Sequence, residues 1–371
     1  MTATTTTSTP LHRLSALGQA VWIDYLSRDA LRDGRIARLI DQDAVVGATS
    51  NPTIFQKAIE EGGAYDEQLR ELRGVDDCKE AFWALATQDV RDACDLFRPV
   101  WDAGSGRDGY VSLEVDPGLA YDTLATFREA QRLHREVDRP NLMVKIPATK
   151  PGLAAFEDAI AAGMSINVTL IFSLRRHEEV VASYLRGLER LVADGGDPAR
   201  VASVASFFVS RIDTEADRRL DALGAAGARL KGRLAIANAR LAYQSYRRAF
   251  TGERWEFLTD KGATPQRVLW ASTSVKNPDY RDTLYVEELI GPDTVDTMPL
   301  ETVAAFQDHG RPAPRLELGL DRARRLFAEL AAAGVDYDEV TDTLEREGVE
   351  KFAASFDELI EGLRRKRAAA A

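Results

Sequence analysis

One charged residue, Lys145, lies inside an apolar segment of this sequence where a charge is costly. The segment NLMVKIPA, residues 141–148, has the length and apolar content of a strand buried on both faces. A buried ammonium either pairs with a carboxylate or gives up its proton, and a neutral amine attacks carbonyl carbons to form a Schiff base. The alternative is that the strand lies at a sheet edge, or that Lys145 reaches solvent at its end.

Other polar residues stand in or directly after apolar segments. They are Asp24, Asn51, Glu114, Asn167, Thr169, Ser206, Arg211, Ser274 and Lys276. If these segments are parallel strands of one closed sheet, the side chains gather at its carboxyl end, around one cavity. Two carboxylates and a lysine on neighbouring strands can carry out acid–base chemistry around a Schiff base.

Structural explanations remain open for several of these residues. Asp24 is explained equally well as the cap of the helix after it, and Asn51, before a proline, as an N-cap. Glu114 could be a solvated rim residue. Arg211 could pair with Asp213 or Glu215 at the start of its helix.

Eight apolar segments alternate with helical patterns along the chain. The strands are expected within residues 20–27, 43–50, 109–117, 141–148, 164–173, 201–211, 267–275 and 294–299. Alternation of this kind predicts an α/β fold with a parallel sheet, and eight repeats favour a closed (β/α)8 TIM barrel over an open doubly wound sheet.

The helical patterns predict longer elements between and after the strands. One helix is expected over residues 28–43, a continuous helical pattern over 67–100, and a long helical region from 213 to about 252. From about residue 315 to the end the chain is helical and charged, with no linker before it. We therefore expect a disordered tail at 1–10 and a single barrel domain over 11–371, with additional N- and C-terminal helices.

Composition excludes several functional classes. The net charge of -11 argues against a nucleic-acid partner. No segment is long and apolar enough to cross a bilayer, and the leader MTATTTTSTP lacks the apolar region of a signal peptide. Cys78 and Cys94 have no metal-ligand spacing and indicate a reducing compartment. We expect a cytoplasmic protein without a membrane partner.

Five motifs occur in chain order: GATSNPTIF, VSLEVDPGLAYD, NLMVKIPAT, SINVTLIFS and the segment SFFVSRID. Together they resemble the motifs of the transaldolase family, whose members are Schiff-base-forming (β/α)8 enzymes of the pentose phosphate pathway. The resemblance extends from Asp24 to about Asn277. The long C-terminal section resembles an actinobacterial-like long form of the family.

The resemblance implies roles for four catalytic residues. Lys145 matches the lysine that condenses with the ketose carbonyl, and Asp24 matches the acid/base that removes a hydroxyl proton as the carbon–carbon bond breaks. Glu114 and Thr169 match the pair that positions a water during formation and hydrolysis of the imine. No metal is needed, because the iminium accepts the electrons, and the four histidines form no ligand cluster. No cofactor is expected.

The resemblance also implies a substrate-binding set. Asn51 and Asn167 match residues that hold the dihydroxyacetone hydroxyls. Ser206 and Arg211 match part of a phosphate site, and Phe208 occupies a position that differs between branches of the family.

The seventh strand departs from the family pattern. Many members have a Ser-x-Arg phosphate clamp there, whereas this sequence has ASTSVKN, so Ser274 and Lys276 are the nearest match. Lysine supplies charge without the bidentate fork of arginine. Phe207 and Ser210 also stand where proline and glycine are common.

The activity implied is transfer of a dihydroxyacetone unit from sedoheptulose 7-phosphate or fructose 6-phosphate to an aldose phosphate acceptor, by a monomer or homodimer. One rival is a fructose 6-phosphate aldolase, which releases free dihydroxyacetone. Those relatives tend to carry glutamine and tyrosine where this chain has Glu114 and Phe208, which favours transfer. The other rival is a non-catalytic sugar-phosphate-binding barrel, whose mark is a lost lysine or acid, and neither is lost here.

Overall fold

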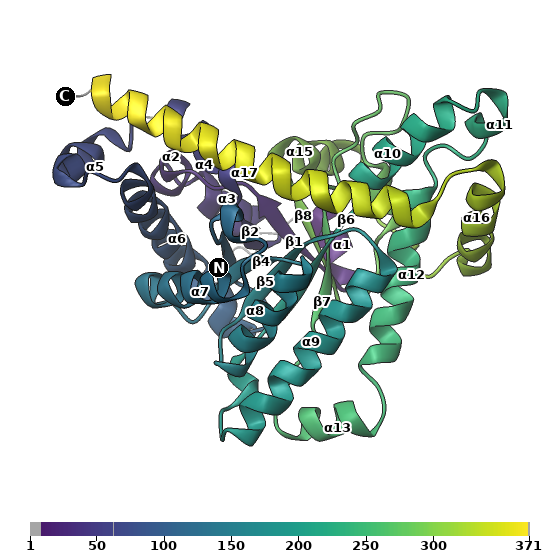
Figure 1. The fold of residues 1–371 in the computed structure, drawn as a ribbon, viewed down its shortest axis with the longest axis horizontal. Coiled ribbons are helices and arrows are strands. Elements are labelled where there is room, and N and C mark those ends of the chain that lie inside the picture. The colour runs from purple at the N-terminus through teal and green to yellow at the C-terminus, as the bar shows by residue number, and fades with distance from the viewer. Residues whose placement is uncertain (1–8, 62, 370–371) are drawn as a thin grey trace, which may run out of the picture.

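Eight parallel strands close into a barrel in chain order, as the alternation predicts (Figure 1). The computed structural model describes residues 9–61 and 63–369. The last strand pairs with the first, so the sheet has no edge. The strands are β1 (Gln19–Asp24), β2 (Val45–Thr49), β3 (Val111–Glu114), β4 (Leu142–Pro147), β5 (Ile166–Ile171), β6 (Ser203–Phe208), β7 (Arg267–Ala271) and β8 (Thr294–Met298).

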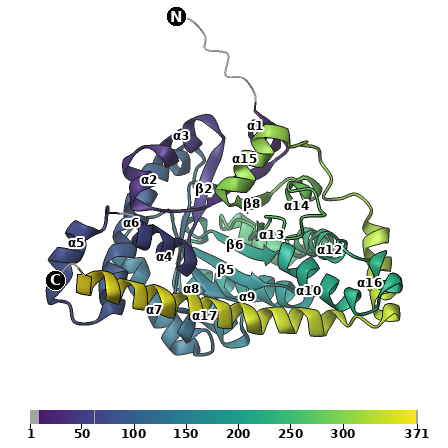
Figure 2. The same ribbon diagram turned by 90° about the horizontal axis from the view of Figure 1, so that it is seen from above.

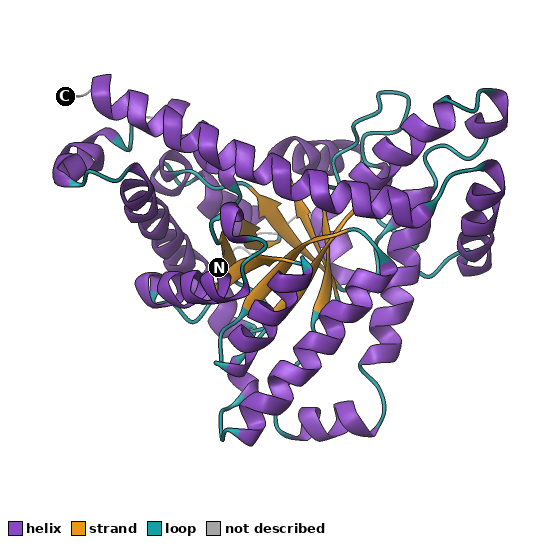
Figure 3. Cartoon of the chain, viewed as in Figure 1, coloured by secondary structure: helices purple, strands orange, loops and turns teal. Residues whose placement is uncertain are grey.

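Helices surround this barrel on its outside (Figure 3). They are α1 (Pro10–Ala16), α2 (Arg28–Arg32), α3 (Arg35–Gln42), α4 (Pro52–Glu61), α5 (Asp66–Glu71), α6 (Cys78–Ala103), α7 (Thr123–Val137), α8 (Lys150–Ala161), α9 (Leu174–Ala193), α10 (Ser210–Asp221), α11 (Ala225–Ala228), α12 (Leu234–Ala249), α13 (Glu253–Asp260), α14 (Leu284–Glu288), α15 (Leu300–His309), α16 (Leu320–Ala333) and α17 (Tyr337–Ala369), with short 3-10 turns η1 (Leu72–Gly74), η2 (Pro117–Leu119) and η3 (Pro198–Arg200). The predicted (β/α)8 TIM barrel with additional terminal helices is confirmed.

The interior of the barrel is filled by alternating large and small side chains. Trp22 on β1 is fully buried and pairs with Gly47 on β2. The indole lies where a side chain of residue 47 would point, and its Nε1 donates a hydrogen bond to Asp108 Oδ1 at 3.3 Å. Two residues further along the same strands, Asp24 pairs with Thr49. Because side chains alternate along a strand, those two also face the interior, one layer above the indole.

Three helical expectations were wrong in detail. The helix expected over 28–43 is two helices, because Gly34 adopts φ 78° between α2 and α3. The pattern over 67–100 is interrupted by η1 and a loop before α6, and the region after 213 is divided into α10, α11 and α12.

The sixth strand ends earlier than expected. β6 stops at Phe208, and Arg211 belongs to the first turn of α10. Residues 1–8 of the expected tail lie outside the described residues, whereas Thr9 caps α1 and Pro10 begins it. No helix among the described residues has both the length and the apolar character that a membrane span requires.

The long helix α17 crosses the carboxyl end of the barrel (Figures 1 and 2). Its buried residues include Val340, Leu344, Phe356 and Leu363. It extends from α16 to the neighbourhood of α5, where the Arg367 guanidinium donates hydrogen bonds to the carbonyls that follow α5. The prediction that the C-terminal helices close or flank the barrel is confirmed for α17.

We predict that Gly47→Ala destabilises the protein. A Cβ at this position would lie 2.5 Å from the Trp22 ring, and the indole is enclosed on all sides. Overpacking of this kind costs about 1–3 kcal/mol of unfolding free energy. Urea denaturation followed by circular dichroism measures it.

The matched control is Gly74→Ala, because nothing lies within 4 Å of a Cβ at that position. That variant is expected to change the unfolding free energy by less than about 0.5 kcal/mol. Equal stability of the two variants would contradict the interior packing described above.

Candidate active site

A cavity of about 770 Å³ opens at the carboxyl ends of the strands, and Phe352 of α17 is among the residues that line it. Nine of the eleven residues that the sequence singled out line it: Asp24, Asn51, Lys145, Thr169, Ser206, Phe208, Arg211, Ser274 and Lys276. The other two, Glu114 and Asn167, lie outside the set that lines this cavity. The expected convergence of polar residues from separate strands on one space is therefore observed.

Lys145 lies at the centre of this arrangement. It sits on β4 between Glu114 on β3 and Asn167 on β5. Its Nζ donates a hydrogen bond to the carbonyl oxygen of Ser50 at 3.1 Å and lies 3.5 Å from Glu114 Oε2. The side chains of the pair are 7% and 5% exposed. The alternatives of an edge strand or of a lysine extending into solvent were therefore wrong.

Glu114 lies beside Lys145, behind the cavity. Burial raises the pKa of the Glu114 carboxyl, although the positive charge of Lys145 acts in the opposite direction. Beyond its contact with Lys145, Oε2 accepts no hydrogen bond from the described residues. Glu114 is 6% exposed, so the interpretation as a solvated rim residue was wrong.

Thr169 presents a second buried oxygen without a partner. Its buried Oγ1 forms no hydrogen bond with the described residues, and the residue is one of those that line the cavity. A bulge follows directly: Leu170 adopts φ 61°, which is rare for a leucine, and the pairing with β6 shifts register there. Buried oxygens without partners suit a bound water or a substrate hydroxyl, so Glu114 and Thr169 offer acceptors on the two strands that flank Lys145.

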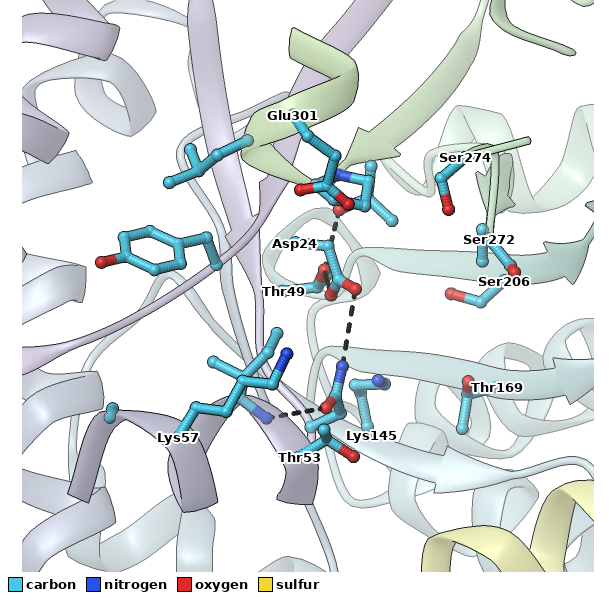
Figure 4. A pocket seen from close by; sticks show the side chains of 18 of the residues that line it. Asp24, Thr49, Thr53, Lys57, Lys145, Thr169, Ser206, Ser272, Ser274 and Glu301 are labelled. Atoms are coloured by element: carbon cyan, nitrogen blue, oxygen red, sulfur yellow. Dashed lines mark hydrogen bonds between the residues drawn. The ribbon is translucent and has the colours of Figure 1, made fainter. Parts of the chain in front are cut away.

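Asp24 ends β1 on another side of the cavity (Figure 4). Thr49 Oγ1 donates to its Oδ1 at 2.7 Å, and Asn51 Nδ2 approaches its Oδ2 at 3.5 Å. Burial raises the pKa of Asp24, while the positive charge of Lys145 and the Thr49 hydrogen bond oppose that rise. Asp24 faces the cavity and caps no helix, because Ser27 provides the cap of α2.

Asn51 both caps a helix and lines the cavity. Its Oδ1 accepts a hydrogen bond from the Ile54 backbone amide at 3.1 Å, which confirms the predicted N-cap before Pro52. Its amide nitrogen faces Asp24. The structural and the site interpretation of this residue are therefore compatible.

Asn167 lies beneath the cavity and not in its wall. It is fully buried, donates to Ser112 Oγ at 3.1 Å, and accepts a hydrogen bond from Ser206 Oγ at 2.6 Å. In this structure its amide joins β3, β5 and β6 and orients Ser206, which does line the cavity.

Cationic groups gather at the end of the cavity near β6 and β7. Arg211 lies 5.3 Å from the Phe208 ring, and no ion pair among the described residues includes it. Asp213 instead accepts hydrogen bonds from the Ala235 amide and the Tyr285 hydroxyl, so the suggested Arg211–Asp213 pair was wrong. Burial lowers the pKa of Arg211, against the effect of the Asp24 charge.

Ser274 and Lys276, which stand after the seventh strand in place of the Ser-x-Arg clamp of the family, contact each other. Lys276 Nζ donates a hydrogen bond to Ser274 Oγ at 2.7 Å, and both residues line the cavity. Together with Arg211 they provide two positive charges and a hydroxyl in one part of the wall. This combination suits an anion such as a phosphate.

Sequence reasoning missed several residues of the cavity wall. Lys57 on α4, Glu301 in the first turn of α15 and Ser272 after β7 all line it (Figure 4). Their position shortly after predicted strands was the signal that could have identified them. Phe352 on α17 also lines the cavity, and no local pattern distinguishes it from other apolar positions of that helix.

Comparison with known proteins agrees with this geometry. The family described as "Transaldolase/Fructose-6-phosphate aldolase" matches residues 21–363. The chain belongs to this family. It is 54% identical over 359 residues to a protein of Acidothermus cellulolyticus named "Transaldolase", covering 94% of this chain and 95% of the relative. It is also 54% identical to the "Transaldolase" of Frankia alni (95% and 96% covered) and 52% identical to "Transaldolase 1" of Streptomyces coelicolor (97% and 95%).

These relatives align with the chain almost from end to end, so they have similar length. The long form expected from the C-terminal section is therefore shared by proteins named transaldolase. The family match includes most of α17, which the sequence motifs had not reached.

We predict that the Lys145–Glu114 pair is energetically coupled. Glu114→Gln leaves a buried ammonium without its counter-charge, which costs about 3 kcal/mol of unfolding free energy. Adding Lys145→Met removes the ammonium and is expected to recover at least half of that loss.

Urea denaturation of the wild type, both single variants and the double variant gives the coupling energy. If the two single effects simply add in the double variant, the pair does not interact across the 3.5 Å that separates the two groups.

Proposed function

We propose that this protein is a transaldolase that transfers a dihydroxyacetone unit between sugar phosphates through a Schiff base on Lys145. The observation that carries the proposal is the position of Lys145: a buried amine beside Glu114 on the neighbouring strand β3, at the wall of a cavity that Asp24, Arg211 and Lys276 also line. The names of the relatives support the same activity.

In the first step the Lys145 amine attacks the ketose carbonyl carbon. The amine must lose a proton before it attacks, and Glu114 is a carboxylate at 3.5 Å that can receive it. The carbinolamine then loses water to give an iminium ion. The unpartnered oxygens of Glu114 and Thr169 suit a water that exchanges protons in this step and in the final hydrolysis.

In the second step the bond between the third and fourth carbons of the ketose breaks. Asp24 takes the proton from the hydroxyl of the fourth carbon, and the bonding electrons move into the iminium to form an enamine. An aldose phosphate leaves. Burial raises the pKa of Asp24 toward neutral pH, and a pKa shifted in this direction suits a group that both accepts and returns a proton.

In the third step the enamine carbon attacks the carbonyl carbon of an acceptor aldose phosphate. Asp24 returns its proton to the new hydroxyl, and water releases the longer ketose from Lys145. Arg211, Ser274 and Lys276 are proposed to hold the phosphate, and Asn51 a hydroxyl of the three-carbon unit. The resemblance placed Ser206 at the phosphate and Asn167 at these hydroxyls. Because Asn167 lies beneath the cavity and accepts a hydrogen bond from Ser206, we propose that Ser206 contacts a hydroxyl in place of Asn167.

Two features favour transfer over simple aldol cleavage. This chain has Glu114 and Phe208 where the resemblance associates glutamine and tyrosine with fructose 6-phosphate aldolases, and the similar proteins reported above are named transaldolases. We further propose a single-domain cytoplasmic enzyme, monomeric or homodimeric, with sugar phosphates as its substrates. The two free thiols, Cys78 and Cys94, suit a reducing compartment.

We predict that borohydride in the presence of fructose 6-phosphate adds a three-carbon unit irreversibly to Lys145. Intact-mass measurement followed by peptide mapping locates the adduct. Lys145→Met is expected to abolish it, because the variant lacks the amine that forms the imine.

The matched control is Lys57→Met, which removes another lysine of the same cavity wall. That variant is expected to be modified like the wild type. An adduct that persists in Lys145→Met, or that maps to Lys57, would sink the Schiff-base assignment.

We predict that Thr49→Val moves the acidic limb of the pH–rate profile to higher pH. Asp24 must be ionised to accept a proton, so turnover falls as the pH drops through its pKa. The Thr49 hydroxyl donates to Oδ1 and stabilises the ionised form. Removing it raises the pKa of Asp24 further.

Turnover of fructose 6-phosphate with erythrose 4-phosphate, measured from pH 4 to 9, tests this sign. Thr53→Val serves as the control, since Thr53 lines the cavity but bonds to Ser355 and not to Asp24. A limb that stays in place in Thr49→Val, or moves to lower pH, removes Asp24 from the proposed base role.

A further inference from the structure

One aromatic ring enters the cavity from the far end of the chain. Phe352 on α17 is half-buried, and it alone of the described residues after Glu301 lines the cavity. Its ring centroid lies 6.0 Å from Lys145 Nζ and 5.8 Å from the guanidinium carbon of Arg211. The ring therefore lies close both to the reactive amine and to the cation proposed for the phosphate.

The position of this ring is fixed by contacts along the whole of α17. At the start of the helix, the Tyr337 hydroxyl accepts a hydrogen bond from the Leu174 amide at 2.9 Å and donates one to Asn238 Oδ1 at 2.7 Å. At its other end Arg367 is bonded to backbone carbonyls.

Between these two ends the helix packs closely on the barrel. A Cβ at Gly348 would lie 3.1 Å from Leu170 Cδ2, and Leu170 is the residue of the β5 bulge with positive φ. Phe352 follows one helical turn after Gly348, and Lys145 Nζ lies over its ring. Phe352 is therefore held over Lys145 by packing.

We propose that Phe352 is a specificity-determining residue, which shields the enamine on Lys145 from solvent proton donors and thereby favours transfer over release of dihydroxyacetone. This inference rests on the proposed function and names the residue that controls its outcome.

The two outcomes differ in one chemical step. In transfer, the enamine carbon forms a bond to the carbonyl carbon of the acceptor, and the iminium of the longer ketose is then hydrolysed. In release, the enamine carbon takes a proton instead. Water then adds to the resulting iminium, the carbon–nitrogen bond breaks, and dihydroxyacetone leaves with the Lys145 amine restored.

Hydrolysis by water is common to both routes, whereas protonation of carbon belongs to release alone. An apolar ring over the amine removes water and hydronium from that carbon without affecting a water held between Glu114 and Thr169 on the flanking strands. The ring face also favours the positive charge of the iminium, as expected for a cation near an aromatic ring.

The test measures the fraction of cleavage events that end in release. With fructose 6-phosphate and saturating erythrose 4-phosphate, glyceraldehyde 3-phosphate counts every cleavage, and free dihydroxyacetone counts each release. Both products are followed by coupled dehydrogenase assays. We expect Phe352→Ala to increase the released fraction at least ten-fold over the wild type, and Phe352→Leu to increase it by a smaller factor.

The matched control is Phe356→Leu, one turn further along α17. Phe356 is buried against Phe82 and Trp83 and does not line the main cavity. It is expected to lower thermal stability but to leave the released fraction as in the wild type. A merely structural role for Phe352 would reduce both product rates together and leave their ratio unchanged.

An unchanged ratio in both Phe352 variants, or an equal increase in Phe356→Leu, overturns the inference and leaves the transaldolase assignment intact. If Phe352→Ala does not fold, as judged by circular dichroism, Phe352→Leu decides the matter by the same ratio. A wild type that forms no glyceraldehyde 3-phosphate from these substrates overturns the proposed function itself, and the inference with it.

Discussion

An ammonium group inside a closed barrel has to be met by polar partners that the barrel itself provides, and the rest of the site follows from that constraint. Lys145 cannot reach solvent along a sheet edge, because none exists. The carbonyl of Ser50, directly after β2, and the carboxylate of Glu114, on the neighbouring strand β3, meet it. The barrel thus holds the amine in one place, within reach of a proton acceptor and at the wall of the cavity.

Burial has a second effect on the acids around Lys145. It raises the pKa of both Asp24 and Glu114, while the positive charge of Lys145 lowers both pKa values and so opposes the rise. The pKa values of both carboxyls are therefore raised, but the two groups can have different functions. Glu114 lies beside the amine, and Asp24 lies across the cavity. Near β6 and β7, Arg211 and Lys276 provide positive charge, and neither belongs to an ion pair among the described residues.

Much of the barrel could be predicted from sequence, because strands buried on both faces appear as apolar segments that contrast with the helices between them. All eight strands were found this way. Boundaries were less certain where no glycine or proline marks the change. The passage from β6 to α10 through Val209 and Ser210 carries no such signal, so Arg211 was placed at a strand end and not in a helix.

Two parts of the site could not have been predicted from local pattern. Asn167 alternates with Thr169 on β5, and only the three-dimensional packing shows that its amide is hydrogen-bonded to Ser112 and Ser206 beneath the cavity. Phe352 is distant in the chain from every strand of the barrel. Its role depends on where α17 crosses, which is set by close packing at Gly348 and by the positive φ of Leu170.

The route of α17 also has a consequence for synthesis of the protein. All eight strands precede this helix in the chain, so on the ribosome the barrel can form with its amine in place before residue 352 has emerged. During that interval α17 does not yet cover the cavity that contains Lys145. The cover arrives only when translation is nearly finished, so a prematurely terminated chain would combine a nearly complete set of reactive groups with no lid above them.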